Sequence, residues 1–168
     1  VFLRYCVAPP LCGPLIVRAR RGFHPRLDVV PSVPAAAPPH KRDRRLSPAE
    51  SRVRMVEAAI AGNPHLQLSR VDVDRPGPHY TIDMVRLLRD SLPAGTELFF
   101  LMGSDSLQDL PNWHQADRLV ANCRLVALSR HDVTLNWEYL ESALPNLHER
   151  VIQLDLSLIH ISEPTRPY

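Results

Sequence analysis

The chain has 168 residues, of which 45% are hydrophobic and 23% are charged, and this composition is typical of a folded globular domain rather than a disordered segment. No run of about 18 apolar residues is present, so we expect neither a membrane-spanning helix nor a membrane partner. The three cysteines are odd in number and lack metal-ligand spacing, which favours a reduced, cytoplasmic setting without a metal site.

Charge and proline are distributed unevenly along the chain. Residues 1–54 contain eleven Lys and Arg against three Asp and Glu, whereas the remainder contains nine against fifteen. Nine of the seventeen prolines also lie within the first 48 residues, which is many for the start of a folded domain. The basic stretch is either an ordinary solvated surface or a surface that attracts phosphate groups.

From residue 47 onward, helix and strand signals alternate. The sequence Ser-Pro-Ala-Glu at 47–50 predicts a helix with Ser47 as its N-cap and Pro48 at its first position. Apolar residues recur at helical spacing up to Ile60, and Gly62-Asn63-Pro64 then ends the helix. Residues 66–73 alternate apolar and polar side chains and predict a strand.

The second half of the chain continues this alternation. After a turn rich in proline and glycine, Ile82, Val85 and Leu88 predict a helix to about Leu92. Strands are then expected at 97–102, 124–129 and 150–156, and helices at 113–122 and 136–144. This order predicts an α/β fold with a doubly wound, Rossmann-like parallel sheet, in which ligands bind beyond the carboxyl ends of the strands.

Two loops contain residue types suited to a nucleotide. Gly103 and Asp105 directly follow a predicted strand, where a glycine permits close approach to a ligand and a carboxylate can bind ribose hydroxyls. The alternative is an ordinary strand-to-helix loop. Trp113 precedes a predicted helix and offers a flat surface for a planar heterocycle, although a lone Trp also often anchors a core.

Two further stretches are ambiguous in the same way. Tyr80 and Thr81 open a predicted helix, with Thr81 either capping it or, together with the free amides of the first turn, binding a carboxylate or phosphate. His40 and Lys41 lie in a proline-stiffened loop, where they either meet phosphates or remain solvated.

The order of these stretches is far more specific than any one of them. The segments "VPAAAPPHK", "LSPAESRVRMVEAAIAGNP", "VDRPGPHYTID", "FFLMGSDSLQDLPNWH" and "CRLVALSR" together resemble bacterial nicotinate-nucleotide adenylyltransferases, within the H-x-G-H nucleotidyltransferases. The resemblance extends without gaps from about Leu27 to Arg130.

The resemblance implies a function and a set of roles. Such enzymes transfer the adenylyl group of ATP, with Mg²⁺, to nicotinate mononucleotide, and release pyrophosphate and deamido-NAD. The implied substrate-binding residues are Tyr80 and Thr81 at the nicotinate end, Trp113 on the pyridine ring, and His40 and Lys41 at the phosphates. The implied ATP-binding residues are Gly103 and Asp105 at the ribose and Arg130 near the adenine. Small molecules rather than nucleic acid are therefore the expected partners.

The beginning of the chain departs from the family. The family's G-G-T-F-D-P-x-H-x-G-H loop falls on Arg4 to Pro14, and Leu11 and Pro14 stand where its two histidines belong. Neither side chain can donate to a phosphate, and proline also lacks an amide N–H. We interpret residues 1–26 as an aberrant segment, produced either by a frameshift or by true divergence.

The end of the chain departs as well. The family closes with a strand and an I-S-S-T-x-I-R motif, but residues 156–166 match the translation of a transposase sequencing adapter. We therefore expect a nucleotidyltransferase domain at 27–155 and adapter read-through at 156–168. The fold is then incomplete at both ends, and this copy is expected to be impaired or inactive. The alternatives are a non-catalytic nucleotide-binding remnant, or an adenylyltransferase for a related mononucleotide.

Overall fold

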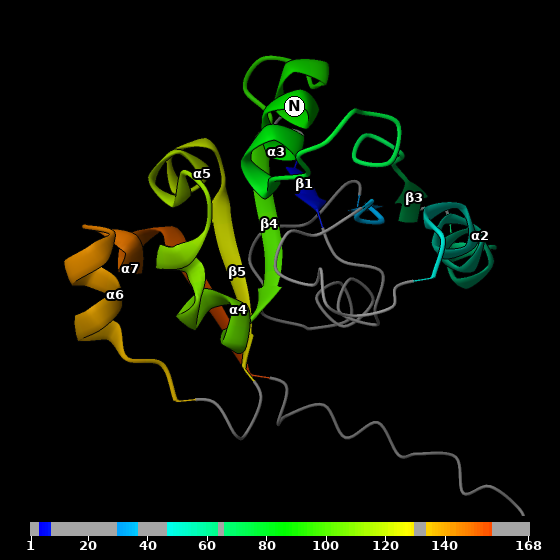
Figure 1. Cartoon of the computed structure of the whole chain (residues 1–168). Coiled ribbons are helices and arrows are strands. Elements are labelled where there is room, and N and C mark those ends of the chain that lie inside the picture. Colours follow the sequence, from blue (N-terminus) through cyan, green and yellow to red (C-terminus); the bar gives the residue numbers. More distant parts are fainter. Residues whose placement is uncertain (1–3, 8–29, 37–46, 64–65, 130–133, 156–168) are drawn as a thin grey trace, which may run out of the picture.

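A parallel sheet of four strands runs through the centre of the molecule in the order β1–β4–β5–β6 (Figure 1). The computed structural model describes residues 4–7, 30–36, 47–63, 66–129 and 134–155. The four strands are β1 (Arg4–Val7), β4 (Glu97–Gly103), β5 (Arg124–Ser129) and β6 (Val151–Asp155). A second, two-stranded parallel sheet pairs β2 (Val30–Ser32) with β3 (Leu66–Leu68), and β2 lies next to β1. The predicted parallel α/β fold is confirmed.

The central strand β4 is buried on both faces, as its uninterrupted apolar sequence predicts. Leu98, Phe100 and Met102 point to one face and join the larger core cluster, whereas Phe99 and Leu101 join the smaller cluster on the other. The period-2 geometry of a strand separates these two sets. Together the two clusters fix β4 at the middle of the fold, so that its carboxyl end is a rigid platform.

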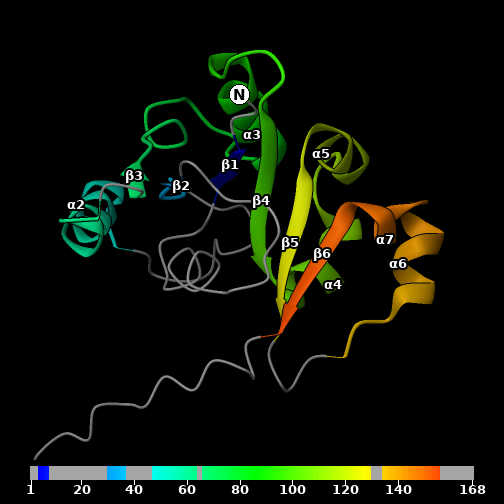
Figure 2. The ribbon, with the colours of Figure 1, turned by 180° about the vertical axis from the view of Figure 1, so that it is seen from behind.

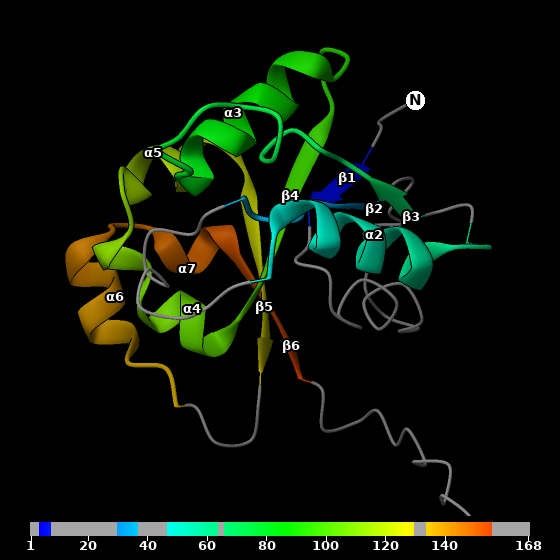
Figure 3. The same cartoon turned by 45° about the vertical axis from the view of Figure 1, so that its right-hand side comes forward.

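Most of the described helices lie on one face of the four-stranded sheet, and the helix at residues 49–60 lies to the side, next to β3 (Figure 2). The described helices are α2 (Ala49–Ile60), α3 (Thr81–Ser91), α4 (Ser104–Gln108), the 3₁₀ turn η2 (Leu110–Asn112), α5 (Ala116–Asn122), α6 (Trp137–Ala143) and α7 (Leu147–Arg150). The larger cluster receives buried residues from α3, α5, α6 and α7, which gather on one side of β4 and β5 (Figure 3). Ile60 of α2 packs against the smaller cluster instead.

The amphipathic pattern of α3 explains its orientation. Ile82, Val85 and Leu88 are buried with exposed fractions of 4% or less, whereas Arg86 and Leu87 face outward. Because α3 packs its apolar side on the sheet and on α5, its first turn is held in a defined place. The predicted helix is confirmed to within one residue at its end.

Three sequence predictions need correction at element boundaries. The cap of α2 is Pro48, not Ser47, and the amides of Ser51 and Arg52 both donate to the Pro48 carbonyl. The strand predicted at 66–73 ends at Leu68, because Val73 and Asp74 donate to the Arg70 carbonyl and close a turn. The helix predicted at 113–122 begins only at Ala116, since η2 occupies 110–112.

The structure defines the side-chain surroundings of Cys123, which is buried and only 3% exposed. Burial raises the pKa of its thiol to about 12, so the thiolate form is scarce near neutral pH. This cysteine therefore serves as a core side chain and not as a nucleophile. Across the described ranges, we find no helix with the length and apolar character needed to cross a membrane.

Candidate functional site

The N-terminus of α3 is the first part of the candidate site. The helix begins at Thr81, and its N-cap is Tyr80, which has an extended backbone and makes no side-chain cap hydrogen bond. The prediction of Thr81 as the N-cap is therefore wrong by one residue. As the first helical residue, Thr81 does not use its hydroxyl to cap the helix, and the first-turn amides lack intrahelical partners. This end of α3 therefore has donors for an anion.

An aromatic stack joins this helix end to the loop after η2. The rings of Tyr80 and His114 lie with centroids 4.0 Å apart and planes 23° apart. Tyr80 immediately precedes Thr81, and His114 immediately follows Trp113. The stack therefore brings Tyr80 and Thr81 beside the loop that contains Trp113. No sequence pattern marks His114 as a site residue, apart from its position next to Trp113.

Trp113 lies at the border between the core and the surface. Its ring meets Phe100 of β4 edge-on, with centroids 6.3 Å apart and planes 82° apart. It packs against the larger core cluster, yet it is only partly buried. This arrangement anchors one edge of the indole and leaves part of the side chain exposed, which a stacking surface requires.

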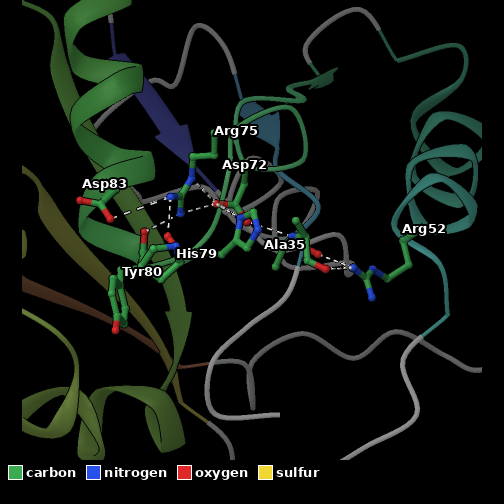
Figure 4. Close-up of polar contacts among 9 residues, drawn as sticks. Ala35, Arg52, Asp72, Arg75, His79, Tyr80 and Asp83 are labelled. Atoms are coloured by element: carbon green, nitrogen blue, oxygen red, sulfur yellow. Dashed lines mark hydrogen bonds and ion pairs between the residues drawn. The ribbon is translucent and has the colours of Figure 1, made fainter. Parts of the chain in front are cut away.

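The turn that leads into α3 is built around a buried charge pair (Figure 4). Asp72 is 5% exposed, and Arg75 donates to its Oδ1 through Nε at 2.9 Å. The same guanidinium donates to the carbonyls of Pro78 and Tyr80, at 2.7 and 3.0 Å. His79 Nδ1 lies 3.7 Å from Asp72 Oδ1. The sequence pattern does not indicate that Asp72, Arg75 and His79 lie together, because loop residues follow no periodic pattern.

Gly103 and Asp105 are adjacent at the carboxyl end of β4. Gly103 is the N-cap of α4, and a Cβ added to it would lie only 2.3 Å from Asp105 Oδ1. The Asp105 carboxylate thus folds back over the glycine, in a space that any side chain would fill. The predicted pair is brought together, and Asp105 remains exposed at the edge where ligands bind in parallel sheets.

Several predicted site residues lie outside the described residues: His40, Lys41, Arg130, and the two positions Leu11 and Pro14. Within the part of the chain that the structure describes, no group of three or more His, Cys, Asp or Glu side chains is arranged to hold a metal ion. The described site therefore consists of two pairs: Tyr80 and Thr81 beside the Trp113 loop, and Gly103 with Asp105.

Comparison with known proteins decides the family. The family model described as cytidylyltransferase-like matches residues 15–163. A probable nicotinate-nucleotide adenylyltransferase of Thermomicrobium roseum is 39% identical over 150 residues, covering 89% of this chain and 70% of the relative. The chain belongs to the nicotinate-nucleotide adenylyltransferase family. A second probable member, from Bacillus pumilus, is 38% identical over 131 residues and covers 78% of this chain and 69% of the relative.

Solved structures of other proteins share the fold of this chain. The Plasmodium falciparum nicotinic acid mononucleotide adenylyltransferase complexed with NaAD matches with a TM-score of 0.68 at 15% identity, covering 94% of this chain and 77% of that one. The same enzyme complexed with APC matches with a TM-score of 0.66 at 14% identity, covering 94% and 76%.

Proposed function

We propose that this fold performs adenylyl transfer from ATP to nicotinate mononucleotide, giving deamido-NAD and pyrophosphate. The observation that supports this most directly is the stack of Tyr80 on His114, because it places a helix N-terminus next to the partly exposed Trp113. The names of the curated relatives agree with this substrate pair. The three cysteines, odd in number, favour a cytoplasmic setting for the reaction.

The nicotinate end is assigned to the α3 entrance. The pyridine ring stacks on Trp113, and the nicotinate carboxylate meets the Thr81 hydroxyl and the first-turn amides of α3. A helix of eleven residues adds a partial positive charge at this end, which favours an anion. Tyr80 supports this arrangement through its stack with His114.

The adenosine end is assigned to the carboxyl edge of the sheet. Gly103 leaves room for the Asp105 carboxylate, and this carboxylate accepts hydrogen bonds from the ribose hydroxyls. We assign Arg130 to the adenine, and His40 and Lys41 to the phosphates. These three assignments rest on the family motifs.

The reaction needs no covalent intermediate on the protein. A phosphate oxygen of the mononucleotide attacks the α-phosphorus of ATP, a new P–O bond forms, and the bond from that phosphorus to the bridging oxygen breaks. Pyrophosphate leaves with the electron pair. The protein contributes positioning and charge neutralisation. Mg²⁺ enters with ATP as part of the substrate, which suits an ion that keeps its waters and binds through phosphates.

We further propose that the chain as written turns over slowly or not at all. Leu11 and Pro14 replace the two histidines that the family places against the ATP phosphates, and neither side chain donates a hydrogen bond. Binding of nicotinate mononucleotide does not depend on these positions and is expected to persist.

An assay of deamido-NAD formation from ATP and nicotinate mononucleotide tests both proposals. We expect no turnover above background for this chain, and measurable turnover for a variant in which the family's whole G-G-T-F-D-P-x-H-x-G-H loop replaces residues 4–14 and its I-S-S-T-x-I-R motif follows residue 155. Robust turnover of the unchanged chain would show that these histidines are dispensable. If nicotinate mononucleotide binds while neither form is active, the chain is a nucleotide-binding remnant.

A further inference from the structure

The buried pair Asp72–Arg75 has more partners than a structural ion pair needs. The two side chains are 7% and 11% exposed, and Arg75 Nη2 lies 2.7 Å from Asp72 Oδ1. Taking two charges out of water is unfavourable unless further hydrogen bonds satisfy them. Here those hydrogen bonds all go to backbone groups that lead into α3 or leave β2, which points to a role in placing these segments.

Arg75 donates hydrogen bonds to two backbone carbonyls at the entrance of α3. Its Nη1 donates to the Pro78 carbonyl at 2.7 Å, and its Nη2 donates to the Tyr80 carbonyl at 3.0 Å. The Tyr80 carbonyl also accepts from the amide of Met84, so it belongs to the first hydrogen bond of the helix. Fixing this carbonyl fixes the peptide between Tyr80 and Thr81, and with it the direction of the first-turn amides.

Asp72 connects this entrance to the end of β2. Its Oδ2 accepts from the amide of Ala36 at 2.9 Å, while its Oδ1 faces Arg75. The Ala36 carbonyl in turn accepts from Arg52 of α2 at 2.6 Å. Figure 4 shows the line of contacts from α2 through the segment that follows β2, at Ala35, to the first turn of α3.

A second arginine in the same turn provides a contrast. Arg70 pairs with Glu50 of α2 at 2.7 Å and with Asp74 at 2.9 Å, and its side chain is 39% exposed. None of its recorded contacts reaches α3 or β2. Arg70 therefore has a similar number of charged partners without any contact to the helix entrance, which makes it a matched control.

Building on the proposed function, we propose that Arg75 is a positioning residue for the nicotinate end of the site, oriented by Asp72. It does not touch the substrate. It holds the Tyr80–Thr81 peptide so that the Thr81 hydroxyl and the first-turn amides face the nicotinate carboxylate. A lysine at this position keeps the charge but lacks the planar fork that reaches Asp72 and two carbonyls together.

Amide hydrogen exchange and ligand binding on the full chain test this proposal, with Arg75→Lys compared with Arg70→Lys. We expect Arg75→Lys to raise exchange at the amides of Met84 and Ala36, which donate to the Tyr80 carbonyl and to Asp72, by about tenfold, and to weaken nicotinate mononucleotide binding by about tenfold. Amides of β5 and α5 should keep their original rates, which a general loss of stability would not allow. Arg70→Lys should change neither exchange nor binding.

If Arg75→Lys does not fold, a second variant, Asp72→Asn, still tests the proposal. Asp72→Asn retains an acceptor oxygen but removes the charge that orients Arg75, and it should raise exchange at the same residues by a smaller factor. Equal effects of Arg75→Lys and Arg70→Lys, or unchanged exchange at Met84 and Ala36 in Arg75→Lys, would overturn the proposal. If the unmodified chain fails to bind nicotinate mononucleotide, the proposed function fails, while the exchange data still decide whether Arg75 fixes the helix entrance.

Discussion

Arg70 and Arg75 lie five positions apart in one turn. Both pair with carboxylates, but only Arg75 also contacts the entrance of α3. Arg75 is nearly buried and ties Asp72 to the carbonyls that lead into α3, whereas Arg70 is exposed and ties Glu50 to Asp74. Exposed ion pairs contribute little to stability because water screens them and their side chains are flexible. Removing one partner of a buried pair leaves an uncompensated charge and is far more damaging.

The contrast shows how side-chain hydrogen bonds can hold a loop that has no regular structure. The turn from 69 to 80 has few backbone hydrogen bonds of its own, and one guanidinium supplies donors to two of its carbonyls. These hydrogen bonds reach the first turn of α3, which we propose binds the nicotinate carboxylate. The Arg70 cluster fastens the same turn to α2 but contacts no candidate site residue.

The largest expected difference between Arg75 and Arg70 is the effect of removing each side chain on stability. Arg75→Met leaves Asp72 buried without its counter-charge, and we expect it to lower the free energy of unfolding by about 2–4 kcal/mol. Arg70→Gln should leave the urea midpoint unchanged within error. Urea denaturation followed by circular dichroism measures both, and equal midpoints for the two variants would contradict the distinction.

The acidic partners should repeat the pattern with a smaller effect. Asp72→Asn keeps the shape and an acceptor oxygen but removes the charge, so we expect a loss of about 1–3 kcal/mol. Asp74→Asn, at an exposed position, should have no measurable effect. The same urea experiment applies, and a larger loss for Asp74→Asn than for Asp72→Asn would reverse the comparison.

The ring stack is a second support of the α3 entrance, independent of Arg75. His114→Ala removes the partner of Tyr80, and such a pair contributes about 0.5–1.5 kcal/mol. We expect nicotinate mononucleotide binding to weaken by about two- to tenfold. Isothermal titration calorimetry measures the dissociation constant. Tyr80→Phe is the matched control, since it keeps the ring, and binding as weak as in His114→Ala would argue against the stack.

The smallest effect concerns the protonation of Glu50. A hydrogen bond from Arg70 is the main cause that lowers the pKa of Glu50 below its ordinary value of 4.5. The contribution of this pair is therefore complete above that ordinary value and declines as the pH falls through the lowered pKa. Arg70→Gln should move the pKa of Glu50 upward, toward 4.5, and NMR titration of its side-chain carboxyl measures this. An unchanged pKa would show that the pair does not form in solution.

The sequence predicted the regular elements well, because their signals are periodic or uninterrupted. The strand at 124–129 is correct at both ends, and the double-sided burial of β4 follows from its unbroken apolar run. The helix predicted at 136–144 is also present, with Asn136 accepting from the amide of Tyr139 as its cap. The errors lie at the boundaries of elements, where the hydrogen bonds of a turn end a helix or strand a few residues away from the predicted position.

The site was predictable only in part, for a physical reason. Motif resemblance proposes Tyr80, Thr81, Gly103, Asp105 and Trp113 as site residues. It did not reveal that Asp72 and Arg75 are buried together, because a charged pair in a loop looks the same in sequence as the exposed pair of Arg70 and Asp74. It also did not reveal the contact of His114 with Tyr80, because the two residues are far apart in the chain. Such long-range contacts are set by packing and leave no local signal.

The central claim is that Trp113 and the α3 entrance form a pocket for nicotinate mononucleotide. Fluorescence titration of the Trp137→Phe variant, in which Trp113 is the remaining tryptophan, tests it most directly. We predict a saturable change with nicotinate mononucleotide, at a dissociation constant between about 1 μM and 1 mM, and binding at least about tenfold weaker for nicotinamide mononucleotide, which lacks the carboxylate. No response to nicotinate mononucleotide, or an equal response to both compounds, would contradict the account.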